Sequence, residues 1–170
     1  MNPDFVLSLE PLHRDACGWA RHCCEGSQVD PSDVLQTAYL KVMQGKIRPR
    51  GDGSLKTWWF GVIRLTAKEE QRRRRFRESL AGKLLRFAPA KVDEPRTATP
   101  IELDESCREL KEALTQLPPR QSEVLHLVFY QDLSISEAAV IMGVSLGSAR
   151  THYERGKARL RELLSSTDHR

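Results

Sequence analysis

Apolar residues recur three and four positions apart through the first half of the chain, and this spacing predicts α-helices. The first helix has Pro11 in a position suited to its first turn. Its apolar stripe is Leu12, Ala16, Trp19, Ala20 and Cys23. A second helix is predicted from Asp30, which can cap its start, to Gly45, which can end it. The stripe of this second helix is Val34, Leu35, Ala38, Tyr39, Val42 and Met43.

A third helix is predicted to begin at Ser54, after a basic loop at residues 46–53 that contains proline and two glycines. Beyond Arg64 its character changes from apolar to basic, and the change ends in four arginines at residues 72–75. Four consecutive arginines surround most of a helical turn, so they cannot all pair with carboxylates on one neighbouring helix. The run therefore favours an anionic partner, for which nucleic acid is the natural candidate. The apolar face of the helix is Leu55, Trp58, Trp59, Val62 and Ile63.

Residues 88–101 contain three prolines and no apolar periodicity, which predicts a flexible linker between two domains. The first domain is then residues 1–87 and the second is residues 102–170. Helical spacing resumes in the second domain and stops at Pro118 and Pro119. The apolar positions of this stretch are Leu103, Cys107, Leu110, Leu114 and Leu117.

The rest of the second domain has the pattern of a helix-turn-helix. Ser134 and Glu137 form a capping box for one helix, and residues 143–145 predict a tight turn before the last helix. A short helix through Val124, Leu125, Val128 and Phe129 comes before them. The last helix is expected to bury Leu146, Ala149, Tyr153, Gly156, Leu160 and Leu163 or Leu164. Its polar N-terminal end suits the major groove of DNA.

Charge is segregated along the chain. The formal net charge is only +4, yet residues 64–86 carry nine Lys or Arg against three Glu, and residues 146–164 carry five against two. Two separated basic segments favour a polyanion bound at two points, although solvated helix faces are the alternative. Hydrophobic residues make up 39% and aromatic residues 6%, so the core is expected to be mainly aliphatic.

Several classes of protein do not fit the sequence. There is no long apolar run and no signal-peptide pattern, so a cytoplasmic protein is predicted. No glycine-rich phosphate loop, metal-ligand spacing or nucleophile motif is present, so neither enzymatic activity nor a cofactor is predicted. Alternating strands and helices are also missing from the first half, which argues against a two-component receiver domain.

The cysteines at positions 17, 23, 24 and 107 form no paired CxxC clusters, so neither a zinc ribbon nor a disulfide framework is indicated. His13 and Cys17 lie four residues apart on the first helix, with His22 and Cys23 nearby. This group favours either a metal or redox site or, as the plainer alternative, buried thiols beside a histidine on the polar face.

Two segments together resemble the extracytoplasmic-function sigma factors, the smallest branch of the sigma family of bacterial RNA polymerase initiation factors. The stretches DVLQTAYLKVMQ at residues 33–44 and WWFGVIRLTAKEEQRRRR at residues 58–75 resemble region two of that family. The stretch LPPRQSEVLHLVFYQDLSISEAAVIMGVSLGSARTHYERGKARLREL at residues 117–163 resembles region four. Many regulators share a helix-turn-helix, but the ordered pair of segments is specific. The resemblance implies an all-α protein, with a region-two-like domain of three or four helices and a region-four-like helix-turn-helix domain.

The resemblance also implies partners: core RNA polymerase, promoter DNA and an anti-sigma factor. The second helix would dock on the polymerase through Asp33, Gln36, Tyr39 and Leu40. Of these, Gln36 lies off the apolar stripe, while core packing is the alternative for Tyr39 and Leu40. The basic loop and third helix would engage the minus-ten element, through Arg48, Arg50, Lys56, Trp58, Arg64, Lys68, Arg72, Arg73, Arg74 and Arg75. The last helix would read the minus-thirty-five element, through Ser148, Arg150, Thr151, Arg155 and Lys157.

The chain departs from the family pattern at two positions near the proposed minus-ten contacts. Thr37 stands where relatives often have an acidic residue, and Leu65 stands where an asparagine often follows the arginine. Core packing is also the alternative to base stacking for Trp58 and Trp59, because both lie on the helix stripe. A further alternative is a sigma mimic that binds an anti-sigma factor without reading promoters; such a protein is expected to have lost the basic faces.

Overall fold

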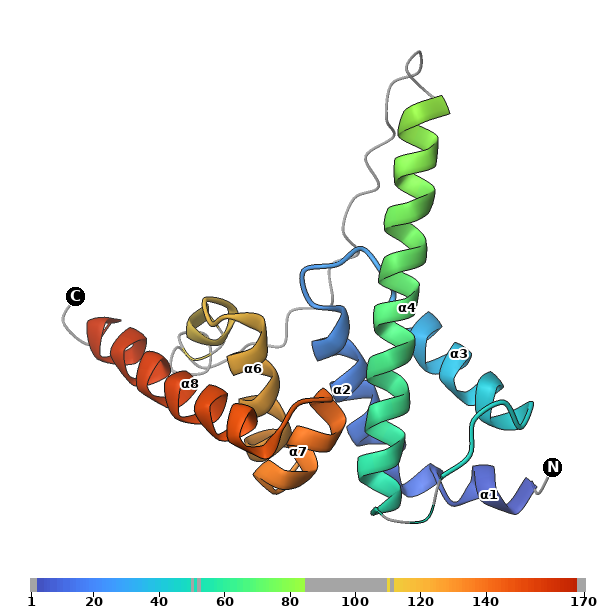
Figure 1. Cartoon of the computed structure of the whole chain (residues 1–170), viewed down its shortest axis with the longest axis horizontal. Helices are drawn as coiled ribbons and strands as arrows, with labels where there is room; N and C mark the ends of the chain where they lie inside the picture. The colour runs from blue at the N-terminus through green and yellow to red at the C-terminus, as the bar shows by residue number, and fades with distance from the viewer. Residues whose placement is uncertain (1–2, 50, 52, 85–109, 111, 168–170) are drawn as a thin grey trace. The chain divides into compact units, whose positions relative to one another are not determined.

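The computed structural model describes residues 3–49, 51, 53–84, 110 and 112–167 of the 170-residue chain (Figure 1). It divides into two compact units, Met1–Pro95 and Arg96–Arg170. That boundary falls inside the linker predicted at residues 88–101, which itself lies outside the described residues. Throughout the described part the regular structure is helical, with no strand, so the all-α prediction is confirmed.

The first unit is built around one long helix. Its elements are α1 (Pro3–Leu7), the 3-10 turn η1 (Glu10–Leu12), α2 (His13–Cys24), α3 (Pro31–Met43) and α4 (Leu55–Leu84). Helices α2 and α3 contact each other and both pack against α4 (Figure 1). The prediction missed α1. Pro11 lies in η1, so α2 begins two residues after it, and Cys24 is buried instead of Cys23.

The predicted helix ends of the first unit are confirmed by their capping contacts. Asp30 accepts a hydrogen bond on Oδ1 from the Ser32 backbone N–H at 2.8 Å, and so caps α3. Gly45, with a φ of 68°, follows the last turn of α3 in the left-handed conformation that glycine adopts without strain. Ser54 Oγ accepts from the Thr57 backbone N–H at 3.1 Å at the start of α4.

Aromatic and aliphatic side chains share the core of the first unit. Trp19, Trp59, Phe60 and Ile63 are fully buried. Trp19 donates its indole N–H to the Phe60 carbonyl oxygen at 3.0 Å, and the Trp19 and Phe60 rings stack at 5.9 Å. This pair joins α2 to α4 by a polar contact inside an apolar core, which fixes how the two helices are rotated against each other.

The second unit contains the predicted helix-turn-helix. Residues 110 and 112–115 are helical and are followed by α6 (Pro119–Leu125), the π-helical turn η2 (His126–Tyr130), α7 (Ile135–Met142) and α8 (Leu146–Thr167). The capping box is confirmed: Ser134 Oγ accepts from the Glu137 backbone N–H, and Glu137 Oε2 accepts from the Ser134 backbone N–H at 2.9 Å. Gly143, with a φ of 64°, ends α7.

Two predicted core positions of the second unit are wrong. Phe129 is 61% exposed, because the wider π-helical turn shifts the side-chain register and the contacts of this segment pass to Leu127, which is fully buried. Leu146 is 39% exposed, because it is the first residue of α8 and precedes the part of that helix that packs against the other helices. Ala149 and Gly156 are buried as predicted.

Helices α6 and α8 approach closely at Gly156. A Cβ atom at this position would lie 3.1 Å from Leu125 Cδ1 and 3.2 Å from Gln121 Cβ. At Gly147, on the same helix, a Cβ atom would meet nothing nearer than Ser145 Oγ at 4.0 Å. The two glycines therefore form a matched pair, one packed and one open.

We predict that Gly156→Val destabilises the second unit by about 1–3 kcal/mol, because the added methyl groups force α6 and α8 apart. Gly147→Val is the control and is expected to change stability by less than about 0.5 kcal/mol. Urea unfolding followed by circular dichroism measures the effect. All three tryptophans lie in the first unit, so their fluorescence transition should stay unchanged. Equal stability of the two variants would contradict close packing at Gly156.

Candidate nucleic-acid interface

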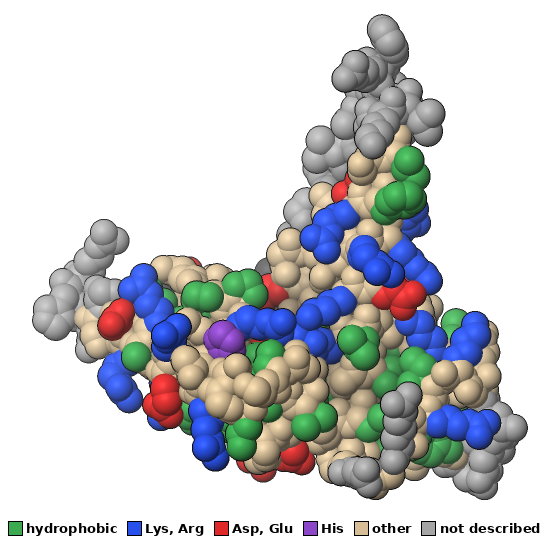
Figure 2. Space-filling view, in the orientation of Figure 1, with side chains coloured by type: hydrophobic (Ala, Val, Ile, Leu, Met, Phe, Trp, Pro, Cys, Tyr) green, Lys and Arg blue, Asp and Glu red, His purple; other side chains and the backbone are tan. Residues whose placement is uncertain are grey.

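Basic side chains gather on the part of α4 that extends beyond the core of the first unit (Figure 2). Arg72, Arg75 and Arg77 are exposed and form no ion pair within the described residues. Arg73 instead pairs with Glu69 at 2.7 Å and with Glu70 at 3.1 Å. The carboxylates that pair with Arg73 therefore lie one turn away on its own helix and not on a neighbouring helix.

Arg74 also has partners inside the unit. Its Nε donates to Glu78 at 2.8 Å, and its Nη1 donates to the Gln28 backbone oxygen at 2.6 Å. Gln71 adds a hydrogen bond to the Cys23 carbonyl oxygen at 2.9 Å. Together these contacts hold the loop between α2 and α3 against α4. Arg74 is thus a structural residue in this state, in contrast to its neighbours Arg72 and Arg75.

Arg64 does not fit the predicted DNA-binding face. Its side chain is only 4% exposed, because it lies one turn after Phe60 on the face of α4 that packs into the unit. We therefore correct this assignment. Lys56, another predicted DNA contact, is half-buried, pairs with Asp15 at 2.9 Å and lies 5.5 Å from the centre of the Phe60 ring.

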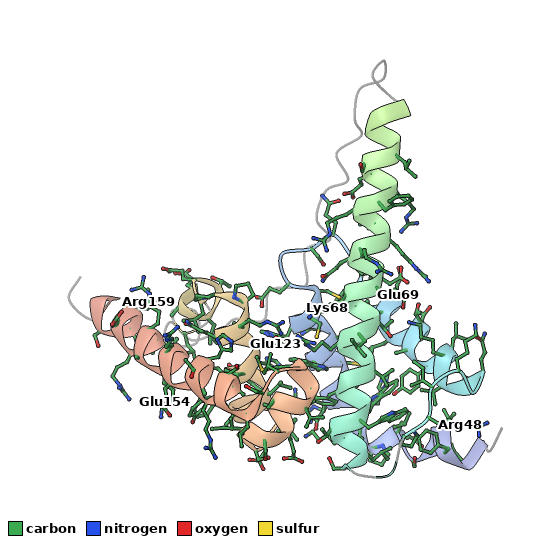
Figure 3. All side chains as sticks on the ribbon, in the orientation of Figure 1. Arg48, Lys68, Glu69, Glu123, Glu154 and Arg159 are labelled. Atoms are coloured by element: carbon green, nitrogen blue, oxygen red, sulfur yellow. The ribbon has the colours of Figure 1, made fainter. Side chains whose placement is uncertain are left out.

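The remaining predicted minus-ten residues lie at three kinds of position. Arg48 is exposed in the loop between α3 and α4, and Lys68 is exposed on α4 (Figure 3). The side chain of Arg50 lies outside the described residues. Trp58 is half-buried between the rings of Phe5 at 5.6 Å and Trp59 at 6.2 Å. Trp59 is fully buried, so it packs in the core, which was the alternative to base stacking.

One face of α3 points away from both α2 and α4. Asp33, Gln36, Leu40 and Met43 are all exposed, and they follow one another at helical spacing. Leu40 is 52% exposed and Met43 is 47% exposed, so neither belongs to the core. For Met43 this contradicts the prediction from the apolar stripe. Tyr39 is half-buried, with its ring 4.8 Å from that of Trp59. The result is a mixed polar and apolar surface on α3.

An ion-pair cluster fastens α3 to α4 beside this surface. Lys41 Nζ lies 2.6 Å from Glu69 Oε2 and 3.3 Å from Thr66 Oγ1. Arg73 pairs with the same glutamate, which Figure 3 labels on α4. The hydrogen bond from Lys41 and the nearby positive charges, including Arg72, lower the pKa of Glu69. Glu69 therefore stays ionised and holds α3, and the face it presents, in place.

Helix α8 carries the predicted residues of the second unit near its N-terminal end. Ser148, Arg150, Thr151 and Arg155 are exposed, and neither arginine forms an ion pair within the part of the chain that the structure describes. Thr151 donates to the Gly147 carbonyl oxygen at 3.0 Å. Lys157 Nζ lies 3.7 Å from Glu154 and 4.9 Å from the centre of the Tyr153 ring. Arg150 and Arg155 are therefore exposed cations of α8 that an external anion can reach.

Sequence reasoning missed several exposed apolar side chains. Leu65 and Phe76 are 64% and 65% exposed on α4, and their separation of eleven positions amounts to about three helical turns, so they share one face. Both residues lie off the predicted apolar stripe, and this position could have identified them as exposed from the sequence. Phe129 and Tyr130 are both 61% exposed, and here no signal existed, because a π-helical turn leaves no mark in the apolar spacing.

The cysteine and histidine residues of the described part do not assemble a metal site. Among the described residues no three His, Cys, Asp or Glu side chains are grouped to hold an ion. Cys17, Cys23 and Cys24 form no disulfide within the described residues, and Cys107 lies outside them. Burial, together with the nearby Asp30, raises the pKa of Cys24 to about 11. Within the same described part, no helix has the length and apolar character needed to span a membrane.

Comparison with known proteins agrees with this architecture. The family model "Sigma-70 region 2" matches residues 9–77, and "Sigma-70, region 4" matches residues 107–160. The RNA polymerase sigma-E factor of Streptomyces avermitilis is 30% identical over 140 residues, which are 82% of this chain and 74% of that protein. The RNA polymerase sigma factor CarQ of Myxococcus xanthus is 29% identical over 137 residues, covering 80% and 75% of the two chains.

Two solved structures share the fold. The sigma factor RpoE of Bartonella quintana, in complex with the anti-sigma factor NepR, matches with a TM-score of 0.70 at 24% identity, covering 96% of this chain and 98% of that one. CnrH in complex with the cytosolic domain of CnrY matches with a TM-score of 0.62 at 19% identity, covering 97% and 90%.

Two helical units in this order, the second ending in a helix-turn-helix, define a transcription initiation factor of the sigma type, which is not an enzyme. The chain belongs to the sigma-70 family of RNA polymerase sigma factors, in its extracytoplasmic-function branch.

Proposed function

We propose that this sigma factor binds core RNA polymerase, directs it to promoters with recognisable minus-ten and minus-thirty-five elements, and assists strand opening there. The observation that carries the proposal is that each unit presents exposed arginines that form no ion pair within the described residues, Arg72 and Arg75 on α4 and Arg150 and Arg155 on α8. Unpaired guanidinium groups on two separate helices suit the phosphates of one DNA molecule contacted at two places. On this proposal the protein acts in the cytoplasm.

The polymerase-binding surface is the exposed face of α3. Leu40 offers apolar area, while Asp33 and Gln36 offer polar groups at helical spacing along the same face. A surface of this mixed kind is typical of protein–protein interfaces, in which an apolar centre is surrounded by polar side chains. Half-buried Tyr39 would contribute from the edge of the face, next to Trp59.

The minus-ten element would be held by α4 and the loop before it. Arg72 and Arg75 would contact backbone phosphates and supply affinity without sequence choice. Arg48 and Lys68 are exposed nearer the core and would extend this basic track. Trp58 is the aromatic side chain available for stacking on an unpaired base, provided that Phe5 moves away from its ring.

The minus-thirty-five element would be read by α8 in the major groove. Ser148 and Thr151 are exposed short side chains near the start of the helix, where a recognition helix contacts base edges. Arg150 and Arg155 would hold the helix against the backbone phosphates.

We also propose an anti-sigma factor as a partner, because the structurally similar RpoE of Bartonella quintana is bound to the anti-sigma factor NepR. The sigma-mimic alternative is less well supported, since it requires loss of the basic faces and both are present. The two functions differ in whether the protein reaches promoter DNA with polymerase.

The proposal predicts that Leu40→Asp weakens binding to core polymerase at least about tenfold, because a carboxylate replaces the apolar centre of the α3 face. Leu65→Asp, at a similarly exposed position on α4, is the matched control and should bind core polymerase normally. Titration of labelled protein with core polymerase, without DNA, measures both affinities. If the parent protein did not bind core polymerase, the proposed function would be wrong.

The arginine run yields a second prediction, because its members differ in their partners. Replacing Arg72 and Arg75 by Ala should lower the affinity of the holoenzyme for promoter DNA. The slope of log K against the logarithm of the salt concentration should become less steep by about 1 to 2, as expected when two phosphate contacts are lost. Replacing Arg73 and Arg74 by Ala should change the salt dependence less, since their charges are already paired.

Filter binding at several salt concentrations compares the two double variants. Because Arg74 also binds the loop between α2 and α3, the fold of the Arg73 and Arg74 variant is checked by tryptophan fluorescence during urea unfolding. Equal loss of salt dependence in both variants would contradict the division of the run into free and paired arginines.

For α8 we predict that Arg150→Ala weakens binding to all promoter variants alike, as expected for a phosphate contact. A base contact would instead cost about 1–3 kcal/mol at one base pair and relax the preference there. Arg159→Ala is the control, because Arg159 lies further along α8 and pairs with Glu162 at 3.0 Å. Holoenzyme binding to a panel of single-base variants at fixed salt separates these outcomes. Unchanged affinity across the panel would exclude DNA contact by Arg150.

A further inference from the structure

Three side chains form a continuous line of contacts where α2 meets α3, and the proposed function makes no use of this line. Cys17 Sγ lies 3.6 Å from His13 Nε2. His13 Nδ1 lies 3.1 Å from the hydroxyl oxygen of Tyr39. His13 is exposed and Cys17 is partly exposed, so solvent reaches the cluster. Cys17 forms no disulfide within the described residues.

The arrangement suits His13 to act as a base toward Cys17. Burial is the main cause that raises the pKa of Tyr39, and the neighbouring Cys17 adds to it, so the phenol stays protonated and neutral. When His13 donates its Nδ1–H to the Tyr39 oxygen, its Nε2 carries the lone pair and faces the thiol. A thiol beside an oriented imidazole is the general arrangement of an activated sulfur nucleophile.

The surroundings of Cys17 are also positively charged. Arg14 and Arg21 lie about one helical turn before and after it on α2, and both are exposed. Neither forms an ion pair within the described residues. Two free guanidinium groups flanking the sulfur favour an anionic reagent over a neutral one.

Cys24, near the other end of the same helix, has the opposite environment. It is 4% exposed, and burial together with the negative charge of Asp30 raises its pKa to about 11. Its thiol is therefore protonated at neutral pH and out of reach of solvent. The fold thus separates a reactive position from an inert one within seven residues.

We propose that Cys17 is a site of reversible modification by an anionic low-molecular-weight disulfide. His13 Nε2 takes the thiol proton, and the Cys17 sulfur attacks one sulfur of the reagent. The reagent's S–S bond breaks as the new S–S bond to Cys17 forms. The leaving thiolate takes the proton back from His13. Cys17 is oxidised to a mixed disulfide and half of the reagent is reduced to a thiol, so the exchange needs no other oxidant.

The consequence of this modification rests on the proposed function. Tyr39 belongs to the proposed polymerase-binding set and is the residue that His13 contacts. A peptide-sized group attached to Cys17 would displace His13 from Tyr39 and cover the edge of the α3 face. Modification would then weaken binding to core polymerase, and a reducing agent would restore it.

The chemistry is tested first without polymerase, with glutathione disulfide as the probe. Three full-length variants keep one cysteine each, Cys17, Cys23 or Cys24, with the other cysteines replaced by Ala. Intact mass measures the rate of adduct formation in each. We expect Cys17 to react at least about tenfold faster than Cys24, and His13→Ala to slow Cys17 by about tenfold. In denaturing urea the three rates should converge, because the difference comes from the fold.

Two results of this first experiment would overturn the proposal. One is a Cys23 that reacts as fast as Cys17, which would mean that exposure alone controls the rate. The other is an unchanged rate in the His13→Ala variant, which would remove the base.

The consequence is tested by titrating the Cys17-only protein with core polymerase before and after modification. We expect the adduct to bind at least tenfold more weakly and dithiothreitol to restore the affinity. An adduct that binds as well as the reduced protein would overturn the regulatory role and leave the proposed function intact. A reduced protein that fails to bind would contradict the proposed function, while the reactivity of Cys17 would still stand on the rates.

Discussion

Burial of the first half of α4 is the constraint on which the rest of the first unit depends. Trp59, Phe60 and Ile63 provide the surface on which α2 and α3 pack, and the indole N–H of Trp19 fixes α2 against it through the Phe60 carbonyl oxygen. The Lys41–Glu69 ion pair then holds α3 at the place where α4 leaves the core. The same helix continues as the basic segment, so the packing of one half sets the direction of the other.

This continuity explains how one short chain can present different surfaces to different partners. The exposed face of α3 and the exposed arginines of α4 are both attached to the same buried segment. In the second unit, α8 likewise has a packed side and an exposed side: Gly156 allows close packing on α6, while Arg150 and Arg155 remain on the surface. In both units a helix is held by its apolar side and leaves its charged side for another molecule.

The sequence predicted those features that depend on neighbouring residues. Caps at Asp30, Ser54 and Ser134 were predicted because the capping side chain and the N–H groups it satisfies are only two or three residues apart. The features it could not predict depend on the third dimension or on small backbone changes. Arg64 looked like the start of the basic segment, and only the packing of α4 shows that it is buried. The pairing of Arg73 with Glu69 and Glu70 could have been predicted from their spacing in the sequence, whereas the contact of Arg74 with Gln28 could not.

The length of α4 has a consequence for how this part of the molecule can evolve. The helix runs for 30 residues, about 45 Å, without a break, so its basic end has no hinge through which to adjust. Inserting a single residue between Ile63 and Arg72 would turn every later side chain by about 100° around the helix axis and carry the arginines to another side. Loops such as residues 25–30 and 46–53 can change length without this effect. Within α4 the number of residues therefore fixes the direction in which the arginines point, independent of which residues they are.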